Sequence, residues 1–387
     1  MCASPSASAM KHEERFVDFL RRVLRTPAPL TEPEDLAWFL ASYAREALAE
    51  IEHAPIPGLT DIAAHLEAAL GVAFGFGPDT ASPLSSDAER AKAQHFFRSI
   101  LVQTLFYGVF SAWILWCQEG PARGERFSWR QTAGRLHLTL LNELFHEMTA
   151  PTQVFTLLLN KRLALAEMTL NRVDRAAFFK RFRQHEAVQY FYEPFLEAFD
   201  PALRKEMGVW YTPEEVVRYM VERVDQALRR DLGIAAGLAD PDVLVLDPCC
   251  GTGGFLIAVL DRIRATLVDL GEDNLASAQV LEAAQNRVFG FEILPAPFVI
   301  AHLQVSLYLE RVGAQMPPKS RAGIYLTNAL TGWSPPKGKQ VKLWEGLKEE
   351  RAQADKVKRK AKVLVVLGNP PYNAFAGLQP ADEEDSV

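Results

Sequence analysis

Apolar and polar positions follow a helical period through the first half of the chain. Leu36, Phe39, Leu40 and Tyr43 recur at the spacing that places them on one face of a helix, and similar sets follow throughout residues 1–200. No self-similar period stands out, so a repeat architecture is not indicated. The pattern predicts an all-helical region and gives no catalytic motif there.

One stretch of this helical region is apolar enough to be weighed against a membrane span. The segment Ile100–Cys117 is rich in aromatic and aliphatic residues, whereas a transmembrane helix needs about 20 such residues. Gln103 and Thr104 lie inside the segment, and Arg98 and Glu119 bracket it. We therefore predict a helix buried in a protein core.

After about residue 205 the pattern changes to short aliphatic runs that alternate with helical segments. Strands are predicted at Val243–Leu246, Val288–Phe291, Gly323–Leu326 and Val363–Leu367. Strands that alternate with helices form parallel sheets covered on both faces, so the fold class is α/β. We expect a helical domain over residues 1–200 and a Rossmann-like, mostly parallel sheet domain over 201–387. Ligands of such sheets bind beyond the carboxyl ends of the strands.

Composition and charge narrow the class of protein. Of the 387 residues, 49% are hydrophobic and 23% are charged, which excludes a disordered, collagen-like or coiled-coil chain. The net charge of −6 excludes a bulk polycation. The four cysteines form no C-x-x-C pair, so neither a disulfide framework nor a zinc site is expected. The N-terminus has no basic region followed by an apolar core, so we expect a cytoplasmic protein.

Any nucleic-acid contact must therefore come from local basic segments, of which there are two. The segment Lys337–Lys362 holds ten basic and four acidic residues. A second cluster consists of Arg172, Arg175, Lys180, Arg181 and Arg183. Each could neutralise DNA phosphates or could be the solvated face of a helix with alternating charge. The sequence leaves both interpretations open.

The first predicted strand runs into a glycine-rich turn, Asp247-Pro248-Cys249-Cys250-Gly251-Thr252-Gly253-Gly254-Phe255. Its glycines allow a tight turn and a close approach of a ligand to the backbone. A phosphate-binding P-loop would need a lysine here, and a dinucleotide fingerprint would need a third glycine where Leu256 stands. Asp247 would repel a pyrophosphate. It suits a cationic ligand with an amino group and a sulfonium, which indicates S-adenosylmethionine.

A second acidic residue, Glu292, follows the next predicted strand. A carboxylate in that place can accept hydrogen bonds from both hydroxyls of a ribose. The separation from the glycines is longer than in dinucleotide-binding folds, and we attribute the excess to an inserted loop at about 270–286. Taken alone, Glu292 could be a solvated charge, but its coupling to the glycine-rich turn favours cofactor binding.

The fourth predicted strand is followed by Gly368-Asn369-Pro370-Pro371-Tyr372. Two successive prolines fix φ at about −65° and restrict the residue before each of them. The stiff backbone holds the Asn369 side-chain oxygen and the Pro370 carbonyl in fixed directions. Both groups are hydrogen-bond acceptors.

Two acceptors that converge on one amino group suit the methylation of an NH2 group. Acceptance of both protons favours a pyramidal nitrogen whose lone pair can meet an incoming methyl. Tyr372 offers a face for a base that has left the DNA stack. This chemistry requires no metal ion and no covalent nucleophile. As a structural alternative, the tetrapeptide is a rigid surface turn.

Taken in order, these motifs resemble those of N6-adenine DNA methyltransferases, in particular the large N-6 methylases of restriction-modification and phage-defence systems. The resemblance implies that S-adenosylmethionine is held by Asp247, Pro248, Gly251, Thr252, Gly253, Phe255 and Glu292. It implies catalytic roles for Asn369, Pro370, Pro371 and Tyr372.

Two further segments add to the resemblance. Met207–Pro213 is similar to a family segment of the form Gly-x-x-Tyr-Thr-Pro, which implies that Tyr211, Thr212 and Pro213 help to hold the cofactor. Locally, the pattern also predicts a capping box of Thr212 and Glu215 for a helix that begins at Pro213. Leu326–Leu330 is similar to the family segment that contacts the cofactor's adenine, which implies a contact from Asn328. A plain turn is the alternative there.

The resemblance implies double-stranded DNA as the substrate and a restriction endonuclease or specificity chain as a partner. The family has further strands and a target-recognition domain after the Asn-Pro-Pro-Tyr motif, so we expect this chain to be a fragment, a truncated product or one chain of a complex. Methylation of a protein glutamine amide or of a ribosomal RNA guanine, or a non-catalytic binding subunit, remain alternatives.

Overall fold

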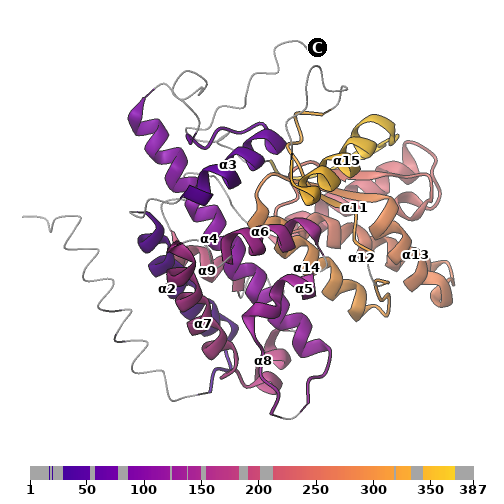
Figure 1. The fold of residues 1–387 in the computed structure, drawn as a ribbon. Helices are drawn as coiled ribbons and strands as arrows, with labels where there is room; N and C mark the ends of the chain where they lie inside the picture. The colour runs from indigo at the N-terminus through magenta and orange to yellow at the C-terminus, as the bar shows by residue number, and fades with distance from the viewer. Residues whose placement is uncertain are drawn as a thin grey trace, which may run out of the picture.

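The computed structural model describes most of both halves of the chain (Figure 1). The described residues are 17, 20, 29–52, 57–76, 86–122, 124–136, 138–149, 154–182, 191–200, 212–317, 320–332 and 343–370. Three predicted site residues, Tyr211, Pro371 and Tyr372, lie outside these ranges.

Apart from an isolated β-bridge between Leu30 and Val173, the regular elements described in the first half are all helices, as the apolar spacing predicts. Its elements are α2 (Pro33–Glu52), α3 (Pro57–Leu70), α4 (Asp87–Gln118), η1 (Trp129–Gln131), α5 (Thr132–Leu136), α6 (Thr139–Thr149), α7 (Val154–Leu170), α8 (Arg175–Phe182) and α9 (Glu193–Phe199). Apolar faces such as Leu36, Phe39 and Leu40 of α2 are buried between these helices.

The strongly apolar stretch lies within α4 and belongs to the core. By length and composition, α4 is the one helix among the described residues that could cross a membrane, with a mean hydropathy of 1.7 over its most apolar window. However, 89% of that window is buried inside the protein, where α4 packs against α2, α5 and α14. The prediction of a buried core helix is confirmed.

The second half alternates strands and helices, also as predicted. Its elements are α11 (Glu214–Arg230), η3 (Gly237–Ala239), β1 (Val245–Asp247), α12 (Gly254–Asp269), α13 (Asp273–Asn286), β2 (Val288–Glu292), α14 (Pro295–Arg311), β3 (Ile324–Leu326), α15 (Glu345–Lys360) and β4 (Val365–Val366). One expectation is wrong: residues 270–286 are not an inserted loop but mostly the helix α13, whose Ala276, Val280 and Ala283 are buried.

The four strands form a single parallel sheet in the order β3-β2-β1-β4. The chain moves from β1 outward to β2 and β3, then returns through α15 to place β4 on the other side of β1. The direction of the order therefore reverses between β1 and β4. In an open α/β sheet the ligand crevice opens at such a switch point, beyond the carboxyl ends of the strands.

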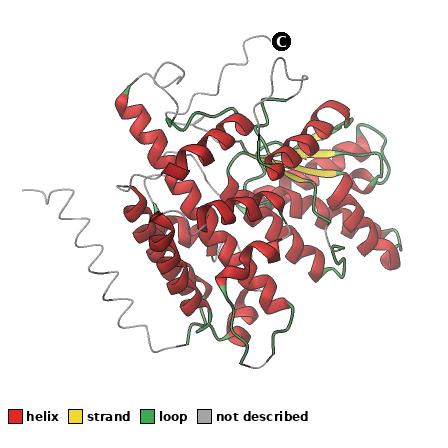
Figure 2. Ribbon diagram, in the orientation of Figure 1, coloured by secondary structure: helices red, strands yellow, loops and turns green. Residues whose placement is uncertain are grey.

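Alternate residues of the strands enter two different cores, because successive side chains of a strand point to opposite faces. Val245, Val288 and Ile324 join the main core with α12 and α14. Leu246, Phe289 and Tyr325 face the other way, where Ala354 and Val357 of α15 cover them. Helices therefore lie on both faces of the sheet (Figure 2).

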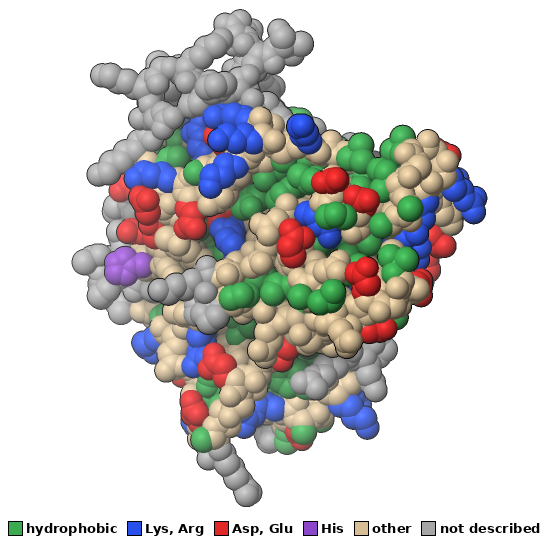
Figure 3. Space-filling model, turned by 90° about the vertical axis from the view of Figure 1, so that its right-hand side faces the viewer, with side chains coloured by type: hydrophobic (Ala, Val, Ile, Leu, Met, Phe, Trp, Pro, Cys, Tyr) green, Lys and Arg blue, Asp and Glu red, His purple; other side chains and the backbone are tan. Residues whose placement is uncertain are grey.

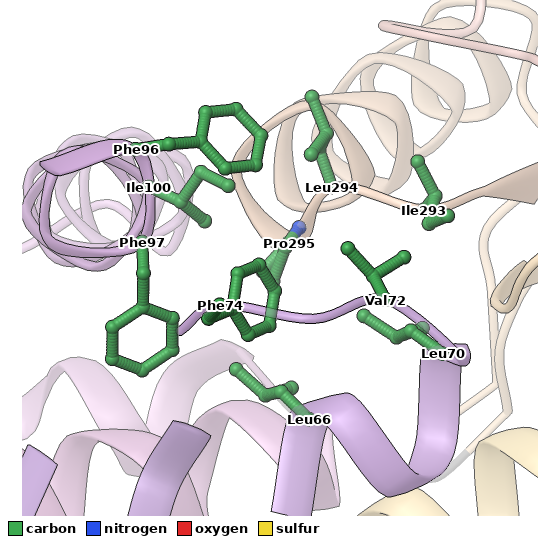
Figure 4. A pocket seen from close by; sticks show the side chains of 10 residues that line it. All are labelled: Leu66, Leu70, Val72, Phe74, Phe96, Phe97, Ile100, Ile293, Leu294 and Pro295. Atoms are coloured by element: carbon green, nitrogen blue, oxygen red, sulfur yellow. The ribbon is translucent and has the colours of Figure 1, made fainter. Parts of the chain in front are cut away.

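The two halves of the chain share one continuous hydrophobic core. The helix α4 packs along α14, and α15 packs against α3 and α6. At one place on this seam, Val72 and Phe74 lie beside Ile293 and Pro295, the residues that follow β2, around a small apolar cavity (Figure 4). The helical half thus supports the segment directly after Glu292.

Candidate functional site

The glycine-rich turn between β1 and α12 depends on two left-handed residues. Gly251 has φ +53° and Gly253 has φ +91°, values that residues with a side chain rarely adopt. A β-carbon on Gly253 would also come within 3.4 Å of the Cα of Ala301 on α14. From the same helix, Gln304 Nε2 donates a hydrogen bond of 2.7 Å to the Thr252 carbonyl. The turn is therefore clamped against α14.

Glu292 joins the glycine-rich turn to the loop that follows β2. Its Oε2 accepts the Gly251 N–H at 2.9 Å, and its Oε1 accepts the N–H groups of Ile293 and Leu294, both at 2.8 Å. A carboxylate has about four lone-pair sites, so three backbone donors leave room for about one more. Glu292 thus organises the two loops, and capture of both ribose hydroxyls by Glu292 stays a prediction.

Asp247, the last residue of β1, is almost completely buried, with 1% of its surface exposed. Its Oδ1 accepts the Cys249 N–H at 3.0 Å. Among the described residues, Oδ2 has no hydrogen-bond partner. A buried carboxylate oxygen without a partner is costly, which marks this position as one that a ligand would complete.

Burial also controls the charge of these two carboxyl groups. Removal from water raises the pKa of Asp247 to about 7, against the opposing hydrogen bond from Cys249 and with a smaller contribution from the Glu292 charge. Burial raises the pKa of Glu292 to about 6, although the three backbone N–H donors favour its ionised form. A cation bound between them would favour the ionised form of both carboxyl groups.

Asn369, which follows β4, is brought to the same edge of the sheet. The Leu367 N–H donates to the Leu246 carbonyl at 3.0 Å and so continues the β1–β4 pairing past the end of the strands. Gly368 then packs directly against the Asp247 carboxylate. Asn369 is half-buried and Pro370 is exposed, so the start of the Asn-Pro-Pro-Tyr motif opens beside the glycine-rich turn.

Thr212 takes part in this site in a way that the sequence did not predict. Its Oγ1 accepts a hydrogen bond of 3.0 Å from Asn369 Nδ2. The predicted capping box is wrong, because α11 begins at Glu214 after the N-cap residue Pro213 and has no side-chain cap. The hydroxyl that would have capped the helix is instead directed across the site.

Asn328 lies in the loop after β3 and connects it to the helical half. It is buried, its Nδ2 donates to the Leu70 carbonyl at 3.0 Å, and its Oδ1 accepts the Leu330 N–H at 2.9 Å. Lys358 of α15 holds the same loop by donating to the backbone carbonyls of Asn328 and Thr331, each at 2.7 Å. This geometry gives Asn328 a structural role, and its contact with a cofactor ring stays a prediction.

The remaining predicted cofactor residues lie in and around the turn. Pro248 and Thr252 are half-buried, whereas the Phe255 side chain is buried in the main core. The sequence did not assign roles to Gly368, Gln304 or Leu70. Its position directly before Asn369 was a usable signal for a role of Gly368. No local pattern indicates Gln304, which lies within α14, or Leu70, which acts through its backbone.

The basic segments are partly used within the protein. Lys358 is buried and bound to carbonyl groups, so its ammonium group is not available for a surface contact. In the second cluster, Arg175 lies 5.3 Å over the ring of Trp116, and Arg181 pairs with Glu32. On the face drawn in Figure 3, the described basic and acidic side chains are interspersed with apolar ones. A contact of the remaining basic residues with DNA stays a prediction.

The parallel sheet, the glycine-rich turn at its switch point and the nearby Asn-Pro tip define an α/β fold of the methyltransferase class. The model of the family described as N-6 DNA Methylase matches residues 183–385, more than half of the chain. The chain therefore belongs to the N-6 DNA methylase family.

Individual relatives agree with this assignment. The type I restriction enzyme EcoEI methylase subunit of Escherichia coli is 28% identical over 126 residues, which are 33% of this chain and 21% of that subunit. The fold is similar to that of the DrdV–DNA complex, with a TM-score of 0.56 and 20% identity over 92% of this chain and 29% of that one. It is also similar to the ATP-dependent Type ISP restriction-modification enzyme LlaBIII bound to DNA, with a TM-score of 0.54 and 17% identity over 88% of this chain and 20% of that one. The chain spans less than a third of the length of these relatives.

Proposed function

We propose that this chain is the catalytic part of a DNA methyltransferase that methylates the N6 amino group of adenine, in a restriction-modification or phage-defence system. The observation that carries the proposal is the placement of Asn369 at the β1–β4 switch point, where Gly368 packs against Asp247 of the glycine-rich turn. Membership of the N-6 DNA methylase family supports it.

The residues of the turn fit S-adenosylmethionine as the cofactor. Asp247 offers a buried carboxylate oxygen that has no partner among the described residues, and a cationic ligand would satisfy it. The left-handed Gly251 and Gly253 keep the backbone free of side chains where a ligand must approach. Glu292 keeps about one acceptor site for a hydroxyl group of the ligand. When bound, the cofactor would supply an electrophilic sulfonium methyl group for transfer to the amine nitrogen.

The chain's own contribution is to orient and polarise the target amine. The Asn369 Oδ1 and the Pro370 carbonyl would accept the two amine protons and direct the nitrogen lone pair toward the crevice. Pro370 has no N–H to compete for these acceptors, and Pro371 stiffens the backbone that carries them. A base can reach Asn369 only after it leaves the duplex, and we assign the stacking surface for it to Tyr372.

Double-stranded DNA is the proposed substrate, and a specificity or nuclease subunit is the proposed partner. The methylase subunit relative belongs to a type I restriction enzyme, and the two similar structures are complexes with DNA. Contacts with DNA phosphates release counterions. Binding of DNA through the basic side chains of the 337–362 segment should therefore weaken steeply as the salt concentration rises.

A methyl-transfer assay tests the proposal directly. The protein is incubated with S-adenosylmethionine carrying a tritiated methyl group and with double-stranded DNA. We expect label on DNA adenine, and loss of at least about 100-fold in rate for Asn369→Ala, because that variant removes one of the two oriented acceptors. Unchanged labelling by Asn369→Ala would overturn the mechanism.

The chemical identity of the product separates the alternatives. DNase, RNase and protease digestions of the labelled product distinguish DNA from ribosomal RNA and from a protein glutamine. We expect only DNase to release the label. Release by RNase or protease alone, or cofactor binding by calorimetry without turnover on any of the three substrates, would refute the proposed function.

A further inference from the structure

We propose that Thr212 is a positioning residue that orients the Asn369 amide for catalysis. This inference rests on the proposed function and adds a residue whose hydroxyl acts through Asn369. The observation is the hydrogen bond of 3.0 Å from Asn369 Nδ2 to Thr212 Oγ1, between residues far apart in the sequence. The two side chains meet at the carboxyl edge of the sheet, where Asn369 leaves β4.

An asparagine amide must be turned correctly to activate an amine. Only Oδ1 can accept an amine proton, while Nδ2 can only donate, and rotation about the last side-chain bond exchanges the two. A partner that accepts from Nδ2 therefore selects the productive orientation and turns Oδ1 away from itself. Thr212 supplies such an acceptor.

The hydroxyl of Thr212 is itself rigidly aimed. Thr212 precedes Pro213, which restricts its backbone to extended conformations, and its β-branched side chain has few rotamers. Pro213 is the N-cap residue of α11, and its carbonyl accepts the N–H groups of Val216 and Val217. The Thr212 hydroxyl is not used as a helix cap. Asn369 also precedes a proline. Two restricted backbones thus face each other across one hydrogen bond.

A buried carboxylate holds α11 in place relative to the glycine-rich turn. Asp225 of α11 is fully buried, and its Oδ1 accepts the Leu238 N–H at 2.8 Å. Its Oδ2 accepts Nε donors from Arg229 of α11 and Arg262 of α12, both at 2.9 Å. This set fixes the second half of α11 against α12, and α11 carries Thr212 just before its N-terminal end.

Steady-state kinetics of the protein test the role of Thr212. Thr212→Val keeps the shape and the β-branch but removes the hydroxyl, whereas Thr212→Ser keeps the hydroxyl. We expect Thr212→Val to lower kcat about tenfold or more, with a change of less than about twofold in the Kd of S-adenosylmethionine measured by calorimetry. Thr212→Ser should recover most of the lost kcat. The exposed Thr60 of α3 provides the control Thr60→Val, which should match the wild type.

Two outcomes would overturn the inference. If Thr212→Val raises the cofactor Kd and leaves kcat at saturating cofactor unchanged, Thr212 is a cofactor-binding residue only. If Thr212→Ser is as slow as Thr212→Val, the hydroxyl is not what matters.

A spectroscopic measurement keeps this test separate from the proposed function. In protein labelled with ¹⁵N-asparagine, the side-chain NH2 signals of Asn369 are identified by their loss in Asn369→Ala. Thr212→Val should shift these signals, and Thr60→Val should not. Unshifted signals would refute the positioning role whether or not the protein methylates DNA. Absence of wild-type methyl transfer, with the shift present, would refute the proposed function alone.

Discussion

Gly368 and Asp247 are packed so closely that no side chain can stand between them. A β-carbon added to Gly368 would lie 2.3 Å from Asp247 Oδ1 and 3.4 Å from the Pro248 ring. This contact brings the residue before Asn369 against the carboxylate that ends β1. The proposed amine-activating residue and the proposed cofactor turn are therefore parts of one packed unit.

Gly368→Ala is expected to damage this unit. The added methyl must displace either the Asp247 carboxylate or the β4 tip, and overpacking of this kind costs about 1–3 kcal/mol in the free energy of unfolding. Chemical denaturation measures that loss. We also expect a weaker affinity for S-adenosylmethionine, measured by calorimetry. As a control, Gly271→Ala places its methyl in open space, although at φ +78°, and should leave the cofactor affinity unchanged. Equal affinities for Gly368→Ala and the wild type would contradict the assigned contact.

Asp247 is expected to make cofactor binding depend on pH. Its pKa is raised to about 7 by burial, so below that pH the group is protonated and does not attract a cation. The affinity for S-adenosylmethionine should therefore rise between pH 6 and pH 8. Asp247→Asn stays neutral throughout, and we expect it to bind weakly and to lose this part of the pH dependence in a calorimetric titration series. A pH slope that persists unchanged in Asp247→Asn would assign it to another group.

The same pKa predicts an opposite effect on the stability of the ligand-free chain. The folded state keeps the Asp247 proton up to about pH 7, whereas an ordinary aspartate releases it near 3.8. The folded state thus binds more protons between these values, and its stability falls as pH rises through about 7. Thermal melting without cofactor should show a larger gain in stability of Asp247→Asn over the wild type at pH 8 than at pH 5. An equal difference at both pH values would argue against this explanation.

Glu292→Gln should loosen both loops that the carboxylate joins. A glutamine has one side-chain oxygen, so it cannot accept all three N–H groups of Gly251, Ile293 and Leu294, and its own NH2 would face one of them. A buried N–H left without a partner costs about 1–3 kcal/mol. The free energy of unfolding, measured by chemical denaturation, and the cofactor affinity should both fall. The control Glu222→Gln, at an exposed position, should change neither. If Glu292→Gln were as stable as the wild type, the three hydrogen bonds would not contribute measurably to stability.

Phe97→Ala should destabilise both halves of the chain together. Phe97 is fully buried, lies 4.8 Å from the ring of Phe74, and lines the apolar cavity on the seam beside Ile293. Removal of such a side chain costs about 3–5 kcal/mol. Calorimetry should show one unfolding transition at a lower temperature. Met168→Ala, at an exposed position, should stay within about 0.5 kcal/mol of the wild type. Two separate transitions, of which one is unshifted, would contradict a shared core.

The sequence determined the elements and the motifs of this protein. Apolar spacing is a local property, so it predicted the helices of the first half, the buried α4 and the strand-helix alternation of the second half. Proline, glycine and carboxylate chemistry is equally local, and it singled out the turn after β1 and the Asn369 tip. The prediction from sequence was wrong at residues 270–286, which mostly form a helix with a mixed surface and not a loop. It was also wrong at Thr212, whose hydroxyl accepts a hydrogen bond from Asn369 and does not cap a helix.

Only the tertiary structure decided which of these residues meet. The strand order places β4 beside β1, and nothing in the local pattern encodes this pairing. That order brings Gly368 against Asp247 and Asn369 within hydrogen-bond distance of Thr212, across long stretches of chain. The use of Leu70 to hold Asn328, and of Lys358 to hold the loop after β3, also depends on the packing of the helical half against the sheet. Contacts between distant residues follow from how whole elements bury their apolar faces, and a local sequence pattern does not contain that information.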